Sequence, residues 1–137
     1  MCLSFVRSCY GIPLPWPWIN PTAAKAWATT PAEHRHKWTG DVDDIPYGAP
    51  VFSHRPGAGK DDAGHVFITG AHNRHGQRIF RSNDIAVTGG ISPVTIDAFT
   101  EKWGHEILGW VDVLNGYALN LPDSPNERER KRNAHRS

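Results

Sequence analysis

The sequence predicts one small α+β domain, at residues 1–121. The chain has 137 residues, of which 39% are hydrophobic, which is enough for one core and too little for two. A helix-like apolar run stands at the N-terminus, and short strand-like runs separated by turn signals follow it. Because a helix precedes a series of short antiparallel strands with one more helix inserted, the expected class is α+β. No internal repeat interrupts this order.

Two helices separated by a loop are expected in the first 30 residues. Residues 2–10 have the apolar periodicity of a helix. Residues 12–21 contain four prolines and are expected to form an extended loop. Thr22 is a suitable N-cap for a second, short helix at 23–29, in which Trp27 is the anchoring side chain.

The middle of the chain predicts a turn, a strand and a β-hairpin. Residues 33–44 are polar and typical of turns. Residues 45–52 indicate a turn that leads into a strand. Residues 66–69 are a short strand, 70–77 its connection and 78–82 the returning strand.

The last third predicts one helix and one strand before a polar tail. Ser92 as N-cap and Pro93 at the first helical position predict a helix that ends at Gly104. Residues 107–112 are the final strand, after which an Asn-Gly pair predicts a turn. Residues 122–137 contain one alanine and few other apolar side chains, so a disordered, charged tail is expected.

The composition argues against several classes of partner. The net charge is +1 with 21% charged residues, so no nucleic-acid partner is expected. No apolar run is long enough to cross a bilayer, so no membrane insertion is expected either. The N-terminus lacks the basic region, apolar run and cleavage site of a signal peptide.

The chain has two cysteines, Cys2 and Cys9, within the first predicted helix. Seven residues of helix separate them by about 10 Å, and a disulfide needs Cα atoms within about 7 Å. They are therefore not expected to form a disulfide. Cys9 lies on the apolar face, where a thiol is core filling. Cys2 stands at the helix N-terminus, where the dipole favours the reactive thiolate.

A nucleophilic cysteine requires a base and a third group that orients the base. His65, at the mouth of the strand that follows it, is the candidate base. Polar residues at the end of the returning strand are candidates for the third group, with Asp84 first and Asn83 second. A competing interpretation is that Cys2 is a small buried hydrophobe and His65 an ordinary strand residue.

The eight histidines raise the possibility of a metal site. They are densest at 34–36 and 72–75, both in segments expected to be loops. Neither cluster has the spacing of a zinc site, so no metal and no cofactor is expected. A zinc amidase nevertheless stays open as an alternative.

Four segments resemble the small peptidase domains of actinobacteriophage endolysins of the lysin A type, within the CHAP and NlpC-like cysteine peptidases. The resemblance covers residues 2 to about 119 in order. The matching segments are 2–11 (CLSFVRSCYG), 48–52 (GAPVF), 64–68 (GHVFI), and 82–85 (SNDI) with 103–104, 108–110 and 114–116.

The resemblance implies a papain-like fold in which an N-terminal nucleophile helix packs on a small antiparallel sheet. It implies Cys2 as nucleophile, His65 as general base and Asp84 as third member. Trp16, Trp18 and Asn83 are then candidates for the substrate groove.

The substrate implied is bacterial peptidoglycan, whose amide bonds such domains hydrolyse without a cofactor. The protein would be made in the host bacterial cytoplasm, act on the cell wall after release, and work as a monomer. The alternative class is a non-catalytic cell-wall-binding or virion structural module that retains a degenerate peptidase fold.

Overall fold

The computed structural model describes residues 23–56, 64–83, 91–95, 100–101, 104–114 and 117–135, without the side chains of 82–83 and 91–94. The first predicted helix and the proline-rich loop lie outside these residues. The described elements are α2 (Ala23–Thr29), η1 (Ala32–His34), β1 (Arg35–Lys37), η2 (Val42–Asp44), β2 (Pro50–His54), β3 (His65–His72), β4 (Arg78–Asn83), β5 (Ile91–Thr95), β6 (Glu106–Val111), β7 (Val113–Leu114), β8 (Tyr117–Ala118) and α3 (Pro125–Ala134).

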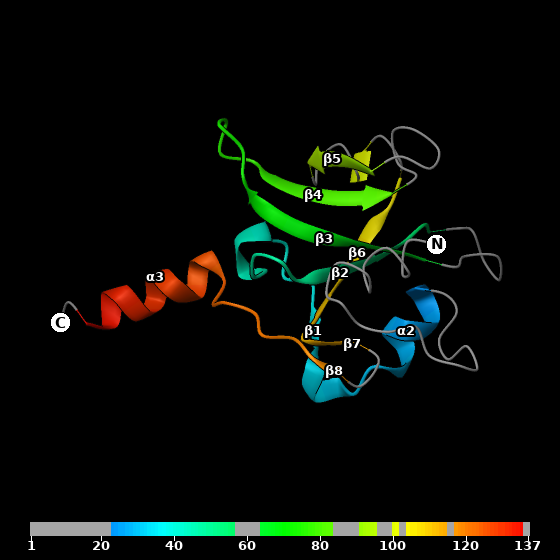
Figure 1. Ribbon diagram of the computed structural model, residues 1–137, viewed down its shortest axis with the longest axis horizontal. Coiled ribbons are helices and arrows are strands. Elements are labelled where there is room, and N and C mark those ends of the chain that lie inside the picture. The colour runs from blue at the N-terminus through cyan, green and yellow to red at the C-terminus, as the bar shows by residue number, and fades with distance from the viewer. Residues whose placement is uncertain are drawn as a thin grey trace.

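An antiparallel sheet of six strands forms the body of the molecule, in the order β1-β6-β2-β3-β4-β5. Strands β2 to β5 are neighbours in sequence and in space, whereas β6 returns to lie between β1 and β2 (Figure 1). A separate two-stranded ribbon joins β7 to β8. Helices together with an antiparallel sheet confirm the expected α+β class.

Both faces of the sheet bury apolar side chains. On one face, Phe52 and Val66 pack with the α2 residues Ala23 and Ala26. On the other face, the neighbouring strand residues Val51 and Phe67 form a second cluster. That cluster includes Ile45 and Ala49 from the segment before β2, and Phe80 and Ile107 from β4 and β6. Successive strand residues point to opposite faces, so one short strand supplies both clusters.

The close approach of β1 to β6 depends on Gly109. It has φ +154°, and a Cβ there would lie 2.0 Å from the carbonyl oxygen of His36 and 2.8 Å from the ring of Trp27. Only glycine, which has no Cβ, allows the two strands to approach so closely here. Trp27, the expected anchor of α2, also packs against Phe52 with 5.7 Å between ring centroids.

The predicted strands of the sheet's centre are confirmed as β2, β3, β4 and β6, with ends that differ by a few residues. The predicted helix at 23–29 is confirmed as α2. The expectation of turns throughout 33–44 was incomplete, because Arg35–Lys37 pairs with β6 as β1.

The helix predicted to begin at Ser92 was wrong over residues 92–95. These residues form β5, in which Pro93 lies opposite Arg81 of β4. A proline cannot donate a ladder hydrogen bond, but β5 is the outermost strand on its side, where proline is tolerated. The β-branched residues Ile91, Val94 and Thr95 also favour a strand.

The C-terminal segment differs from the expected disordered tail, because Pro125–Ala134 forms α3. The Ser124 hydroxyl accepts a hydrogen bond from the backbone N–H of Glu127, and Pro125 occupies the first turn. Asn126 donates to both Asp41 and Asp44 and thereby holds the start of α3 to η2. No residue of α3 is buried, and the helix extends away from the sheet (Figure 1).

Candidate functional site

His65 is the first residue of β3 and lies opposite Ser53 of β2. Its ring is half-buried and contacts two other rings. The centroid of Phe67 is 6.0 Å away, and that of His105 is 5.9 Å away at an interplanar angle of 67°. The predicted base therefore lies at one end of the sheet with a second imidazole beside it.

His105 precedes β6 and is held by Ser53. The Ser53 hydroxyl is hydrogen-bonded to Nδ1 of His105 at 3.1 Å, and Ser53 is only 1% exposed. A buried hydroxyl on a central strand fixes the position of one ring nitrogen. Two imidazoles and a hydroxyl, from β3, β2 and the residue before β6, thus meet at this end of the sheet, a group that we call the His65 cluster (His65, His105, Ser53).

The His65 cluster can transfer protons, because a neutral imidazole donates a hydrogen bond from one ring nitrogen and accepts one at the other. The sequence alone did not identify His105 as a neighbour of His65. A weak signal was present, since His105 stands two residues before the strand predicted at 107–112. What the sequence did not give was the order of the strands, which brings β6 and β3 to either side of β2.

The other predicted site residues are only partly described. Cys2, Asp84, Trp16 and Trp18 lie outside the described residues, as does the side chain of Asn83. Asn83 is the last residue of β4. Because β3 and β4 are antiparallel, the end of β4 lies at the end of the sheet where His65 begins β3.

A second polar cluster is centred on Asp112, directly after β6. Its Oδ1 accepts from Nδ1 of His34 at 2.6 Å and its Oδ2 from Nε2 of His36 at 3.0 Å. Burial alone would raise the pKa of Asp112, but the hydrogen bonds from His36 and His34 outweigh it and hold this pKa below its ordinary value. The His36 ring also stacks on Trp110, with 3.9 Å between centroids.

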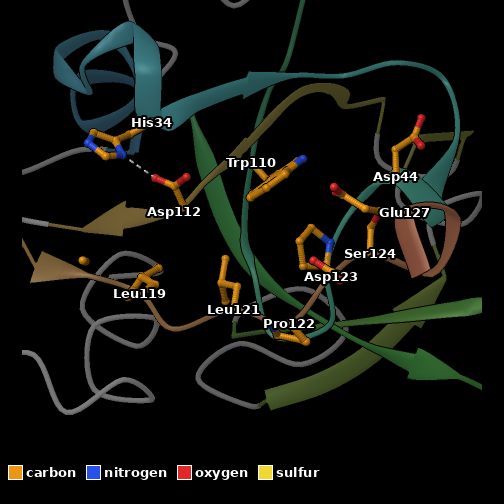
Figure 2. A pocket seen from close by; sticks show the side chains of 12 residues that line it. His34, Asp44, Trp110, Asp112, Leu119, Leu121, Pro122, Asp123, Ser124 and Glu127 are labelled. Atoms are coloured by element: carbon orange, nitrogen blue, oxygen red, sulfur yellow. Dashed lines mark hydrogen bonds and ion pairs between the residues drawn. The ribbon is translucent and has the colours of Figure 1, made fainter. Parts of the chain in front are cut away.

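These three residues form the Asp112 cluster (His34, His36, Asp112), and two of them, His34 and Asp112, border a cavity of about 380 Å³. In Figure 2, His34 and Asp112 lie on one side of the cavity, Asp44 and Glu127 lie on the other, and Trp110 lies between them. Hydrogen bonds from Thr39 and Asn126 lower the pKa of Asp44, so this carboxylate is already engaged within the protein.

The dense histidine segments hold hydrogen bonds to carboxylates. His34 and His36 share Asp112, and His72 donates to Asp43 at 2.9 Å. Among the residues that the structure describes, no group of three or more histidine, cysteine, aspartate or glutamate side chains is arranged to hold a metal ion. None of the described helices is both long and apolar enough to cross a bilayer.

Comparisons with known proteins identified no relative of this chain. No protein-family model, no curated protein and no solved structure matches the chain. The functional argument therefore depends on the residues themselves.

Proposed function

We propose that this chain is a cysteine peptidase or amidase with a papain-like arrangement that hydrolyses amide bonds in bacterial peptidoglycan. In this proposal Cys2 is the nucleophile, His65 the general base and Asp84 the residue that orients His65. The observation that supports it best is the position of His65. A half-buried imidazole at the start of a central strand is held by a rigid scaffold and stays accessible to a substrate.

The reaction proceeds through a thioester. The Cys2 thiolate attacks the scissile carbonyl carbon, and a backbone N–H at the start of the N-terminal helix stabilises the oxyanion. His65 gives its proton to the leaving amine as the C–N bond breaks. Water then attacks the thioester, with His65 taking the water proton, and the thiolate is released with the cleaved carboxylate product.

The pairing of β3 with β4 supports Asp84 as the third residue. Ile68 lies opposite Arg81, and Thr69 lies opposite Phe80. The proposal requires this register to continue to the start of β3, which would bring residue 84 opposite His65. A carboxylate there would hold the imidazole and stabilise its charged form.

His105 is the competing candidate for the residue that positions His65. Its ring already lies against His65, and Ser53 fixes its orientation. A neighbouring imidazole can act as a hydrogen-bond partner for the base, but it supplies no negative charge. The two candidates therefore differ in their expected effect on the pH profile of the rate.

The first test measures the lysis of purified host cell walls by turbidity and by release of new amino groups. We expect wild type and Cys9→Ser to lyse the walls, and Cys2→Ser to lose activity by about 10³-fold or more. Lysis by Cys2→Ser at the wild-type rate would refute the proposal. Lysis that a chelator abolishes and a thiol alkylator spares would indicate a zinc amidase instead.

The second test separates the candidates for the third residue. We expect Asp84→Asn to lower kcat by about 10²-fold or more and to shift the pH profile, because the charged partner of His65 is lost. Asn83→Ala and His105→Gln should have smaller effects on kcat. A dominant loss in His105→Gln would assign the positioning role to His105. Wall binding without any lysis by wild type would favour the non-catalytic module.

A further inference from the structure

A cavity of about 480 Å³ is lined by the segment after β1, by η2 and by the turn that joins β3 to β4. Its volume falls within the range of about 300–1,000 Å³ that is usual for small-molecule sites. Arg78 borders this cavity, but its side chain is 0% exposed and cannot contact a ligand. The described residues that line the cavity therefore offer no accessible cationic side chain, which argues against an anionic ligand.

Trp38 supplies an apolar aromatic surface to the cavity. Its half-buried side chain packs against the core cluster that contains Val51 and Phe67. Its backbone N–H donates to the carbonyl oxygen of Leu108 at 2.9 Å, so the residue is fixed to β6. The indole N–H is not buried and donates to none of the described residues. Trp38 can therefore offer a ligand both an aromatic surface and one hydrogen-bond donor.

Two glycines keep the cavity open. Gly40 has φ +90° and Gly76 has φ +77°, a backbone conformation that other residues rarely adopt. A Cβ at either residue would have nothing within 4 Å. Bare backbone thus borders the cavity at these two places, which leaves room for a ligand beside it.

Asp41 and Gln77 supply complementary polar groups. The Oδ1 of Asp41 accepts from the backbone N–H of Asp43 at 2.9 Å, and its Oδ2 accepts from Asn126 at 2.8 Å. A carboxylate has about four acceptor sites, so each oxygen can accept one further hydrogen bond. The Oε1 of Gln77 accepts from Asn73 at 3.3 Å, whereas its amide N–H groups donate to none of the described residues. Both residues are exposed, so the cavity offers free acceptors and free donors to a neutral polar ligand.

We propose that this cavity binds an N-acetylated sugar ring of the glucosamine type. In such a pyranose the large substituents are equatorial, so each face of the ring presents C–H groups that pack against the electron-rich face of an indole. The ring hydroxyls both donate and accept, which suits Asp41 and Gln77. The acetamido carbonyl oxygen is a suitable acceptor for the indole N–H of Trp38.

The choice of an acetamido sugar rests on the proposed function, because the glycan strands of peptidoglycan consist of N-acetylated amino sugars. The cavity lies away from the proposed hydrolytic site. Arg78, on its wall, pairs with His72, which is seven residues from His65 along β3, or about 23 Å at ~3.3 Å per residue. A glycan strand bound here would hold the wall against the protein while a peptide is cleaved at the other end of the sheet.

The test follows the full-length, ¹⁵N-labelled chain by NMR while the trimer of N-acetylglucosamine is added. We expect a saturable shift of the indole N–H resonance of Trp38, with those of Trp27 and Trp110 unchanged. Sorbitol, which has hydroxyls but no ring, should bind at least about tenfold more weakly. No saturable shift at Trp38, or equal shifts with sorbitol, would overturn the proposal. Cys2→Ser should bind the trimer as wild type does, so failure of hydrolysis and failure of sugar binding are measured separately.

Variants at the cavity wall check that the cavity is the site. Gln77→Ala removes amide donors and Trp38→Phe removes the indole N–H, so each should weaken trimer binding by about threefold or more. Asn120→Ala, at an exposed position elsewhere, should leave the affinity unchanged. The described side-chain hydrogen bond of Gln77 is that with Asn73, so Gln77→Ala is expected to fold. Equal affinities in wild type, Gln77→Ala and Trp38→Phe would overturn the proposal.

Discussion

The two ends of strand β3 hold their polar side chains in different ways. At the hairpin end, His72 lies between two fixed partners. The Tyr47 hydroxyl is 2.9 Å from its Nδ1, and its Nε2 donates to Asp43. Beside it, Arg78 donates to three backbone carbonyls. At the other end, the half-buried ring of His65 lies beside the rings of Phe67 and His105.

This difference indicates a division between stability and chemistry along one strand. At the hairpin end, three N–H groups of the buried Arg78 are paired with backbone carbonyls, so a substitution of Arg78 is expected to destabilise the protein. The His65 end carries a half-buried imidazole beside a second imidazole, that of His105, and imidazoles are the side chains that exchange protons near neutral pH. Function is therefore expected to depend on His65, and stability on Arg78.

The strongest test of this division compares the two histidines of β3. We expect His65→Ala to lower the rate of wall lysis by about 10³-fold with little change in unfolding free energy. His72→Ala should keep the lysis rate and lose about 1 kcal/mol of stability, because two hydrogen bonds at a partly exposed position are removed. Turbidity assays and urea denaturation measure the two effects. Loss of lysis in His72→Ala together with lysis at the wild-type rate in His65→Ala would contradict this division.

Removal of the buried guanidinium should have the largest effect on stability. Arg78→Met removes three hydrogen bonds to backbone carbonyls, one buried and two partly buried, and we expect a loss of about 3–5 kcal/mol. Arg81→Met, on the same strand but exposed, should change the stability by less than about 0.5 kcal/mol. Urea denaturation at pH 7 measures both. Similar losses in the two variants would contradict the anchoring role of Arg78.

A buried hydroxyl near the middle of β3 sharpens the same comparison. Thr69 is 2% exposed, donates to the carbonyl oxygen of Pro46 at 2.7 Å, and accepts from the backbone N–H of Ala49 at 3.0 Å. Thr69→Val should cost about 1–2 kcal/mol, since both groups lose the hydroxyl and keep only the long hydrogen bond between them, at 3.4 Å. Thr39→Val, which removes hydrogen bonds to Asp44 and Asp41 at an exposed position, is the comparison for differential scanning calorimetry and should cost less than about 1 kcal/mol. A Tm equal to that of wild type would show that these bonds do not stabilise the hairpin end.

The Asp112 cluster provides the smallest expected effect and a pH signature. The folded-state pKa of Asp112 lies below its ordinary value of 3.8. Its contribution to stability is therefore present above about pH 4 and is lost as the pH falls through the folded pKa. Because the side chain is one-third exposed, we expect Asp112→Asn to cost only about 0.5–1 kcal/mol at pH 7. Urea denaturation at pH 7 and pH 2.5 should show this difference shrinking in acid; an unchanged difference would contradict the ion pairs.

The central strands could be predicted from the sequence because their residues carry the pattern of a buried sheet. Two pairs of neighbouring residues place an apolar side chain on each face of the sheet: Val51 with Phe52, and Val66 with Phe67. A sheet that is covered on both faces requires this pattern. Strand β1 could not be predicted in this way. Arg35–Lys37 is polar, and it becomes a strand only through pairing with β6, where Gly109 admits it.

Two Ser-Pro pairs show how far a local signal extends. Ser92 and Pro93 suggested the start of a helix but lie in β5, whereas Ser124 and Pro125 do begin a helix, α3. The first pair is followed by β-branched residues and finds a partner strand in β4. The second pair is followed by charged residues that favour a helix and has no strand beside it. The capping signal is the same, and tertiary pairing decides the outcome.

The candidate site could be predicted only in part for a similar reason. His65 was found because it precedes an apolar strand. The contact of His65 with His105 depends on β6 returning beside β2, and residues 40 positions apart give no local sign of such a return. The burial of Arg78 could not be predicted from the sequence either, because an arginine at the start of a hairpin strand is usually exposed.

The two outermost strands of the sheet have a consequence for behaviour at high concentration. One of them, β5, contains Pro93, which has no N–H to offer an incoming chain. The other, β1, is only three residues long and carries Arg35 and Lys37. Short length, positive charge and proline are each devices that discourage intermolecular strand addition and aggregation. The sheet is therefore protected on both sides against growth into a larger assembly.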